Sequence, residues 1–442
     1  MGHHHKKVSE IDPKSIEIDK STLWGKLPII GLVLAGVGFG IGFGVPGPGG
    51  VFAEDPDLWE AKKWTAFLNG LMFAMALGFG GLIFVTIQHL VRANWSIVVR
   101  RLAEHAMFTL PFIALIGGLT VIWGPGGHYV FEWMHVEHVM HDPMLKAKVA
   151  YLNPGSAGAR FGFYLALWSI VAFLFWHWSR KQDTAKTKEE QEALSLKCRK
   201  LAPLALVIFA LSMTFSAFDF MMSLDPHWFS TIFGVYFFAG QALAIHSLLV
   251  IMCFFLQRKG MLKGVVTPEH FHDLGKFMFG FTVFWTYIGF SQYFLIWYAN
   301  IPEETHWFSY RAHGQWLSLS LLLIFGRFVI PFFLLLRRGW KRNPNYLVWM
   351  AVWIVVMEFI DMFWLIQPPF AHHASVKLEK AGAAEEVVHY FHNHITFVPA
   401  DIGFLLGFLG LFLALFGWSL TTSKLVPIND PRLEESLNHE NF

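Results

Sequence analysis

About ten runs of ~20 apolar residues, separated by short charged connections, constrain the fold of this chain more than any other feature. An apolar run of that length can cross the hydrocarbon layer of a membrane as a helix, which satisfies its own backbone hydrogen bonds there. The sequence therefore predicts an all-α integral membrane protein with about ten transmembrane helices. The predicted spans lie near residues 27–44, 64–90, 103–123, 161–179, 201–222, 230–256, 274–298, 315–336, 346–366 and 399–420.

Composition and cysteine content exclude several other classes of protein. Of the 442 residues, 55% are hydrophobic and 15% are charged, whereas about 25% charged residues is typical of soluble domains. A net charge of +2 gives no sign of a nucleic-acid-binding surface. Cys198 and Cys253 lie far apart and form no CxxC or CxxCH motif. The sequence therefore supports no disulfide framework, no iron–sulfur cluster and no covalently bound haem.

The charges of the connections alternate along the chain and predict its orientation. One set of connections is basic, for example at Arg100-Arg101 and Arg337-Arg338, whereas the alternate set is acidic or mixed, as at Glu303-Glu304. Because positive connections stay on the cytoplasmic side, both termini are predicted to be cytoplasmic. We expect a cytoplasmic N-terminal segment (residues 1–26), a membrane domain (27–422) and a cytoplasmic tail (423–442).

Ionisable side chains inside the predicted spans are the candidate functional residues. Such groups are costly in a bilayer and usually face a bundle interior or a water-filled path. One interpretation is static pairing, Asp273 with Lys276 and Arg327 with Glu358 or Asp361. The other is a proton route, because two carboxyl groups three residues apart on one helix cannot both carry charge cheaply and are expected to share a proton. The proton-route candidates are Asp219, His246, Asp273, Lys276, Arg327, Glu358 and Asp361.

The connections predicted to lie outside carry candidates for contact with partner proteins. After the seventh span, the acidic pair Glu303-Glu304 lies near Trp297 and Trp307, which combines charge with aromatic anchors. Two long connections, near residues 124–160 and 367–398, are rich in histidine. They contain no cysteine and no tight ligand motif, so we predict no metal site and favour contact with partners.

Two segments resemble a known family of membrane subunits. The first is FSAFDFMMSLDPHWFSTIFGVYFFAG (215–240), and the second is HDLGKFMFGFTVFWTYIGFSQYFLIWYANIPEET (272–305). Both are similar to the F subunit (ActF) of bacterial alternative complex III, within the wider NrfD/PsrC family of quinone-interacting membrane proteins. The resemblance covers roughly residues 60–420.

The resemblance implies two four-helix bundles with peripheral helices, in a multi-pass protein of the bacterial inner (cytoplasmic) membrane. It implies a complex that passes electrons from quinol to cytochrome c or an oxidase, with haem c and iron–sulfur clusters held by partner subunits. Those partners are an iron–sulfur subunit, multihaem and monohaem cytochrome c subunits, a terminal oxidase and the NrfD-like paralogue ActC. The main quinol site would lie in ActC. For this chain it implies no redox centre and roles in proton translocation, complex assembly and contact with quinone. The proton-route candidates named above are the positions that fit such a path.

Two other functions stay open at the level of sequence. A proton-coupled secondary transporter would also have about ten spans and buried charge, although transporters tend to have paired broken helices in two repeats. Here only Pro111 and Pro331 are expected to interrupt spans, and no repeat symmetry is evident. The third possibility is a membrane scaffold of the complex with no role in proton transfer.

Overall fold

The computed structural model describes residues 5–441, and helices are the only regular secondary structure in that range, with no strand. Nine helices in that range are long and apolar enough to cross a membrane. The predicted span at 274–298, the seventh along the chain, is also one long helix, α11 (Pro268–Ala299), but its polar and aromatic residues lower its mean hydropathy and leave it outside the nine. The prediction of an all-α, multi-pass membrane protein is confirmed.

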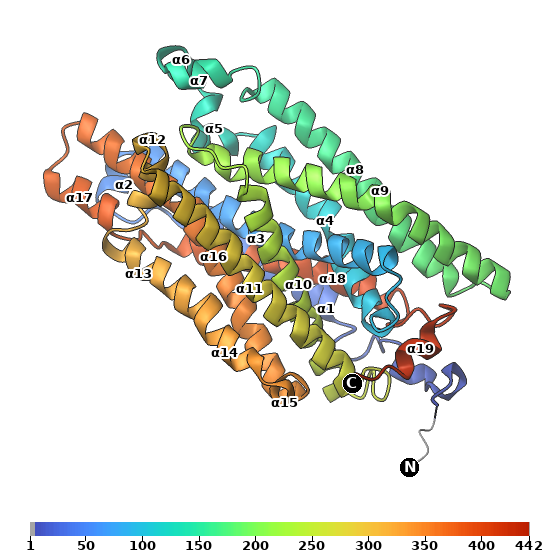
Figure 1. Cartoon of the computed structure of the whole chain (residues 1–442). Helices are drawn as coiled ribbons and strands as arrows, with labels where there is room; N and C mark the ends of the chain where they lie inside the picture. Colours follow the sequence, from blue (N-terminus) through green and yellow to red (C-terminus); the bar gives the residue numbers. More distant parts are fainter. Residues whose placement is uncertain (1–4, 442) are drawn as a thin grey trace.

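The long helices follow the predicted spans and extend beyond most of them (Figure 1). α3 has 35 residues, about 50 Å at 1.5 Å per residue, so its ends lie outside a hydrocarbon layer of about 30 Å. Besides α11 the long elements are α1 (Leu27–Gly44), α3 (Pro56–Leu90), α4 (Ile97–Gly117) with the π-helical η3 (Gly118–Ile122), α8 (Pro154–Gln182), α9 (Lys188–Phe220), α10 (Phe233–Arg258), α13 (Gly314–Leu323) continued by the π-helical η6 (Ile324–Val329) and α14 (Ile330–Leu336), α16 (Pro344–Lys380) and α18 (Pro399–Thr421).

The long helices pack as two four-helix groups and one peripheral pair. α3, α4, α8 and α9 form the first bundle, and α10, α11, α13–η6–α14 and α16 form the second. α3 joins the bundles by packing on α10 and α16. The peripheral helix α1 packs along α18, where Gly31 and Gly38 approach the backbone of α18 so closely that a Cβ atom at either would lie within 2.4 Å of it. Small residues permit this close contact between membrane helices.

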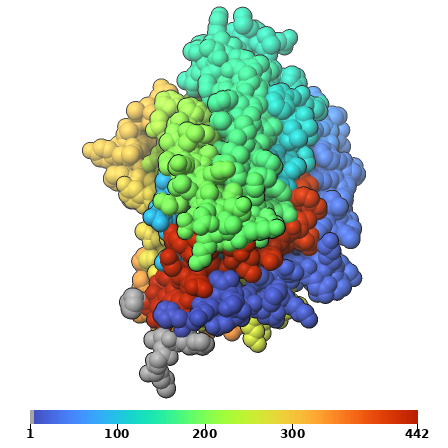
Figure 2. All heavy atoms as spheres, turned by 90° about the vertical axis from the view of Figure 1, so that its right-hand side faces the viewer, coloured from blue at the N-terminus to red at the C-terminus, as the bar shows by residue number. Residues whose placement is uncertain are grey.

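Both chain ends lie together at one end of the molecule, which we call the inner end after the predicted topology (Figures 1 and 2). Backbone hydrogen bonds join Leu425 N to Ile16 O (2.7 Å) and Leu262 N to Ser15 O (2.8 Å). The Asn438 side chain accepts from Lys6 N (2.7 Å) and donates to Lys6 O (2.9 Å). The N-terminal segment and the tail therefore fold against each other. Around them lie the short elements η1 (Val8–Glu10), η2 (Pro13–Ser15), α15 (Arg338–Lys341) and α19 (Leu433–Leu437).

The two long outer connections contain short helices. The first connection holds α5 (Gly126–Val130), η4 (Glu132–Met134), α6 (Val136–His141) and α7 (Pro143–Lys148). The other short helices of the outer end are α2 (Val51–Glu54), η5 (Met222–Leu224), α12 (Pro302–Ser309) and α17 (Glu385–Asn393).

The expected loop at 367–398 instead begins as helix, because α16 continues through Pro368 and Pro369. These prolines lack the N–H groups that would bond the carbonyls of Trp364 and Leu365. The buried Arg311 guanidinium donates to both carbonyls instead (3.2 and 3.1 Å), which explains why the helix passes the prolines. Pro203 also lies inside a long helix, α9, so Pro111 and Pro331 are not the only interior prolines.

Candidate functional site

A buried ionic cluster lies at the centre of the second bundle, and Arg327 is its only cation. Arg327 occupies the π-helical η6, a local irregularity that is often found at functional sites. Its guanidinium pairs with Glu358 on α16 and lies 3.2 Å from Asp361 Oδ2. It also donates to the Met357 carbonyl (3.1 Å) and lies 4.6 Å from the centre of the Trp285 ring. The sequence-based pairing of Arg327 with these two carboxyl groups agrees with this geometry.

The two carboxyl groups have different hydrogen-bond partners. Asp361 accepts from the Tyr236 hydroxyl at Oδ1 (2.5 Å) and from the Trp285 indole at Oδ2 (3.2 Å), in addition to its contact with Arg327. Glu358 bonds Arg327 through Oε2, but its Oε1 is buried and has no hydrogen-bond partner among residues 5–441. Asp361 is therefore surrounded by donors, as suits a carboxylate, whereas Glu358 has one oxygen free to hold a proton.

The charge of this cluster does not balance if both acids are ionised. Arg327, Glu358 and Asp361 are all buried, and arginine stays protonated in proteins. Two carboxylates against one guanidinium would leave a net negative charge in an apolar interior, which is costly. One bound proton makes the cluster neutral.

The wall of α10 leaves room for this cluster and carries further buried polar groups. A Cβ atom at Gly240 would lie 2.9 Å from Glu358 Oε1 and 3.0 Å from Arg327 Nη2, so a side chain there would displace the ion pair. Both amide atoms of Gln241 are buried without a partner. Buried polar groups of this kind are the ones that internal water commonly bonds.

His246 lies on α10 six residues inward of Gly240, about 9 Å along the helix. Its Nδ1 is bonded to Ala242 O (2.7 Å), and its Nε2 is buried without a partner. Its ring stacks on Phe277, with the ring centres 4.9 Å apart. His246 therefore shares the second bundle with the ionic cluster but does not touch it.

Asp273 and Lys276 form the ion pair that their spacing suggests, at the inner end of α11 (2.5 Å). Asp273 also bonds His439 Nε2 (2.7 Å) and Asn441 Nδ2 (3.2 Å) of the tail. Lys276 is 45% exposed and donates to Asn441 Oδ1. This pair therefore fastens the C-terminal tail at the inner surface.

Asp219 belongs to the first bundle. It forms a two-point ion pair with Arg160 of α8, at 3.1 Å (Nε) and 2.8 Å (Nη2). Ser212 and Ser216 of α9 and Ser223, just beyond its end, are buried together with Asp219. Ser212 accepts from Trp168 of α8 (2.8 Å), so this polar group belongs to the contact between α8 and α9.

A second buried ionic network was missed by sequence reasoning. Lys62 of α3 donates to Asp401 of α18 (2.9 Å) and to Gln367 of α16 (2.8 Å), and all three are buried. Gln367 follows Glu358 by nine residues, or two and a half helical turns, so the two networks lie on opposite faces of α16. Lys62 lies just before the predicted span at 64–90, so the sequence places it in an outer connection and gives no sign that it is buried.

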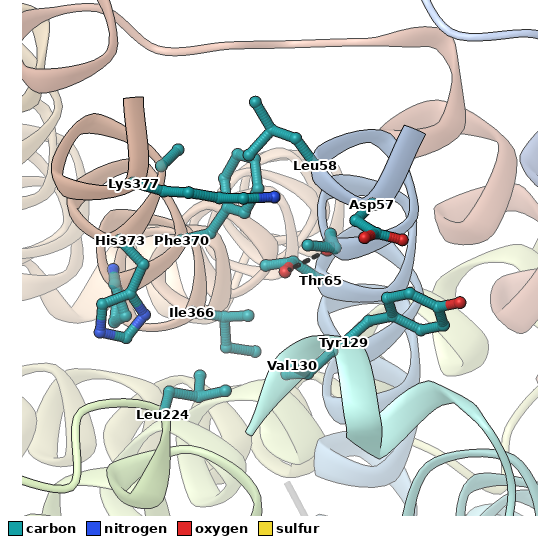
Figure 3. A pocket seen from close by; sticks show the side chains of 13 residues that line it. Asp57, Leu58, Thr65, Tyr129, Val130, Leu224, Ile366, Phe370, His373 and Lys377 are labelled. Carbon is teal, nitrogen blue, oxygen red and sulfur yellow. Dashed lines mark hydrogen bonds between the residues drawn. The ribbon is translucent and has the colours of Figure 1, made fainter. Parts of the chain in front are cut away.

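A small outer pocket lies beside this network, with a volume of about 120 Å³. His373 and Lys377 of α16 line one side, and Asp57 and Thr65 of α3 line the other (Figure 3). Phe370 lines the pocket, and its ring centre lies 5.9 Å from Lys62 Nζ. Phe370 therefore lies between the pocket and the buried lysine network as a shared contact.

The outer end of the second bundle is closed by contacts of α12. Asp225 accepts from His306 Nε2 (3.0 Å) and from the Tyr310 hydroxyl (2.9 Å). Burial alone would raise the pKa of Asp225, but these two hydrogen bonds outweigh it and lower the pKa to about 2. The same hydrogen bond raises the pKa of His306 above its usual value, despite partial burial. The pair is therefore ionised and holds α12 in place.

The predicted partner-contact residues divide into exposed and buried groups. Trp297 is 60% exposed, Glu303 is exposed and Glu304 is half-buried. Trp307, by contrast, is only 3% exposed and stacks on Trp228, with ring centres 4.3 Å apart. Trp307 therefore packs inside the outer cap and is not available to a partner, which corrects the expectation for that residue.

Two further observations complete the description of the site. Within residues 5–441, no group of three or more His, Cys, Asp and Glu side chains is placed to hold a metal ion. The chain matches no protein-family model, and no curated protein sequence matches it.

Proposed function

We propose that this chain is an integral membrane subunit of a quinol-oxidising electron-transfer complex of the alternative complex III type, in the bacterial cytoplasmic membrane. In this proposal it holds no redox centre and transfers protons through its second bundle. The main quinol site, haem c and the iron–sulfur clusters belong to the ActC-like, cytochrome c and iron–sulfur partners, while this chain also serves in assembly and in contact with quinone. The observation that carries the proton role is the buried cluster of one guanidinium and two carboxyl groups.

The cluster can hold and release one proton with little rearrangement. Asp361 keeps its donors Tyr236 and Trp285 in either state. Glu358 Oε1 has no protein partner, so a proton there can leave without breaking a protein hydrogen bond. Loss of the proton leaves a buried negative charge, whose cost changes when a neighbouring subunit changes its own charge. A redox change in a partner would in this way drive proton uptake or release.

The inner part of the route runs along the α10–α11 wall. His246 Nε2 and the Gln241 amide are the buried groups on α10 without protein partners. Phe277, stacked on His246, lies one helical turn from Asp273 at the inner surface. The proposed order from inside is Asp273 and Lys276, then His246, then Glu358 with Asp361. Asp219 lies in the first bundle and pairs there with Arg160, so we leave it out of this route.

Membership of the complex is tested by isolation from native membranes in mild detergent. We expect a tagged full-length chain to bring down subunits that contain c-type haem and non-haem iron, measured by haemochrome spectra and iron analysis. Isolation of the chain alone, together with solute uptake driven by a pH gradient in reconstituted vesicles, would identify a secondary transporter and reject the proposal. Isolation with the redox subunits but without any effect of Glu358→Gln on proton movement would leave only the scaffold role.

A further inference from the structure

A second cavity, unrelated to the proposed proton route, lies at the inner end of the first bundle and has a volume of about 330 Å³. It is formed by the inner ends of α3, α4 and α9 and by the tail, where Arg100 bonds Asp430 (2.6 Å). Figure 2 shows the face on which α9 lies next to the C-terminal segments. The volume falls in the range of small-ligand pockets.

The lining of this cavity has an excess of positive charge. Four guanidinium groups, those of Arg92, Arg100, Arg199 and Arg432, face only two carboxylates, Glu192 and Asp430. Asp430 is already paired with Arg100. Within residues 5–441 the side chains of Arg92 and Arg199 pair with no carboxylate. Arginine presents several N–H donors in a fork that matches the oxygens of a phosphate group.

Two buried polar side chains in the lining have atoms without a partner. Gln88 is 4% exposed and His89 is 7% exposed, and both line the cavity. Gln88 Oε1 and His89 Nε2 make no hydrogen bond. The His89 ring is held by parallel stacking on Phe175, with ring centres 5.5 Å apart. A buried acceptor and a buried ring nitrogen beside free guanidinium groups suit a ligand that has hydroxyl groups as well as an anion.

The backbone and the surroundings of the cavity add two observations. Arg92 has a φ of +52°, a left-handed conformation that costs energy for a residue with a side chain. Its carbonyl is held there by Arg432 Nη2 (2.6 Å). Leu196, which also lines the cavity, is an exposed apolar side chain on a helix predicted to cross the membrane. The cavity therefore joins a cationic interior to an apolar edge at the predicted depth of lipid headgroups.

We infer that this cavity binds the phosphodiester headgroup of an anionic phospholipid, with Arg92 and Arg199 on the phosphate and with Gln88 and His89 on headgroup hydroxyls. The acyl chains would leave past Leu196. Bound in this way, the lipid would join α3, α4 and α9 to the tail.

The test is a lipid titration of the delipidated full-length chain in detergent, read by the midpoint of thermal unfolding. Phosphatidylglycerol should raise the midpoint in a saturable way, because a ligand that binds only the folded state stabilises it. The double variant Arg92→Gln/Arg199→Gln should need about tenfold more lipid for the same shift. The matched control Lys197→Gln/Lys200→Gln removes two exposed charges of α9 outside the cavity and should titrate as wild type.

The comparison ligands identify the source of the phosphate. Phosphatidylcholine and inorganic phosphate should each produce a much smaller shift than phosphatidylglycerol. A full shift with inorganic phosphate would assign the site to a free anion and overturn the lipid assignment. Equal titration of the cavity variant and its control, or no shift of the wild type, would overturn the site. Phosphorus analysis of the purified proteins gives an independent count of retained lipid, which should fall only in the cavity variant.

Discussion

Replacement of Arg327 with leucine tests the buried cluster most severely, because Arg327 is its only cation. The variant leaves Glu358 and Asp361 buried without a guanidinium and removes the bond to the Met357 carbonyl. Removal of one partner from a buried ion pair costs about 3–5 kcal/mol. The cation–π contact with Trp285 adds to the loss, but the two costs are not additive. We therefore expect the free energy of unfolding to fall by about 3–5 kcal/mol.

A second substitution separates charge from packing. Glu358→Gln in the Arg327→Leu background removes one of the two uncompensated carboxyl groups. The double variant should recover about 1–3 kcal/mol relative to Arg327→Leu alone, as expected for residues in direct contact. The control is Arg337→Leu, which removes an exposed arginine just after the inner end of α14. The Arg337 guanidinium lies over the Trp340 ring, and its loss should cost less than about 1 kcal/mol.

The assay is unfolding of the full-length chain in mixed micelles with increasing denaturing detergent, followed by tryptophan fluorescence. The account fails if Arg327→Leu loses no more stability than Arg337→Leu. It also fails if the effects of Arg327→Leu and Glu358→Gln simply add, because then the two side chains would not be coupled.

Three other outcomes follow from the structure. Gly240→Val should destabilise the protein by about 1–3 kcal/mol in the same unfolding assay, because its side chain would overlap the ion pair; a neutral effect would show that the cluster has room to move. The ion pair of Asp225 and His306 should hold α12 fully below about pH 6.5, the ordinary His value, and should weaken as pH rises through the raised pKa of His306. In acid, the same ion pair should weaken as pH falls from 3.8, the ordinary pKa of an aspartate, toward about 2, the lowered pKa of Asp225. Hydrogen exchange of α12 against pH measures this, and the alkaline dependence should disappear in His306→Gln. Replacement of both Glu303 and Glu304 with lysine should weaken assembly with the proposed partner subunits in a salt-sensitive way. Unchanged subunit stoichiometry at low and high salt would contradict a partner interface at these residues.

The sequence was sufficient for features that depend on local pattern. Apolar runs located the long helices, and three-residue spacing on one helix placed Glu358 and Asp361 together. Arg327 was paired with them because a mid-span arginine must find a carboxylate in an apolar interior. The same reasoning paired Asp273 with Lys276.

Features that depend on contacts between distant segments could not be predicted in this way. Lys62 looked like part of a charged connection, and only the packing of α3 against α18 shows that it is buried on Asp401. Arg311 lies between two predicted spans, and nothing near it in the sequence indicates that it donates to two carbonyl groups of α16 beside the prolines. Asp219 was a candidate for the proton route, but nothing local in the sequence indicates that its partner is Arg160.

Proton movement coupled to quinol oxidation tests the central claim most directly. The proposed complex would be isolated by way of this chain and reconstituted in proteoliposomes, and protons moved per electron would be measured for wild type, Glu358→Gln and the control Glu379→Gln. The control removes an exposed carboxylate from the same helix. The account predicts that Glu358→Gln assembles and oxidises quinol, but moves fewer protons per electron than wild type and Glu379→Gln. An assembled Glu358→Gln complex with the wild-type ratio would contradict it.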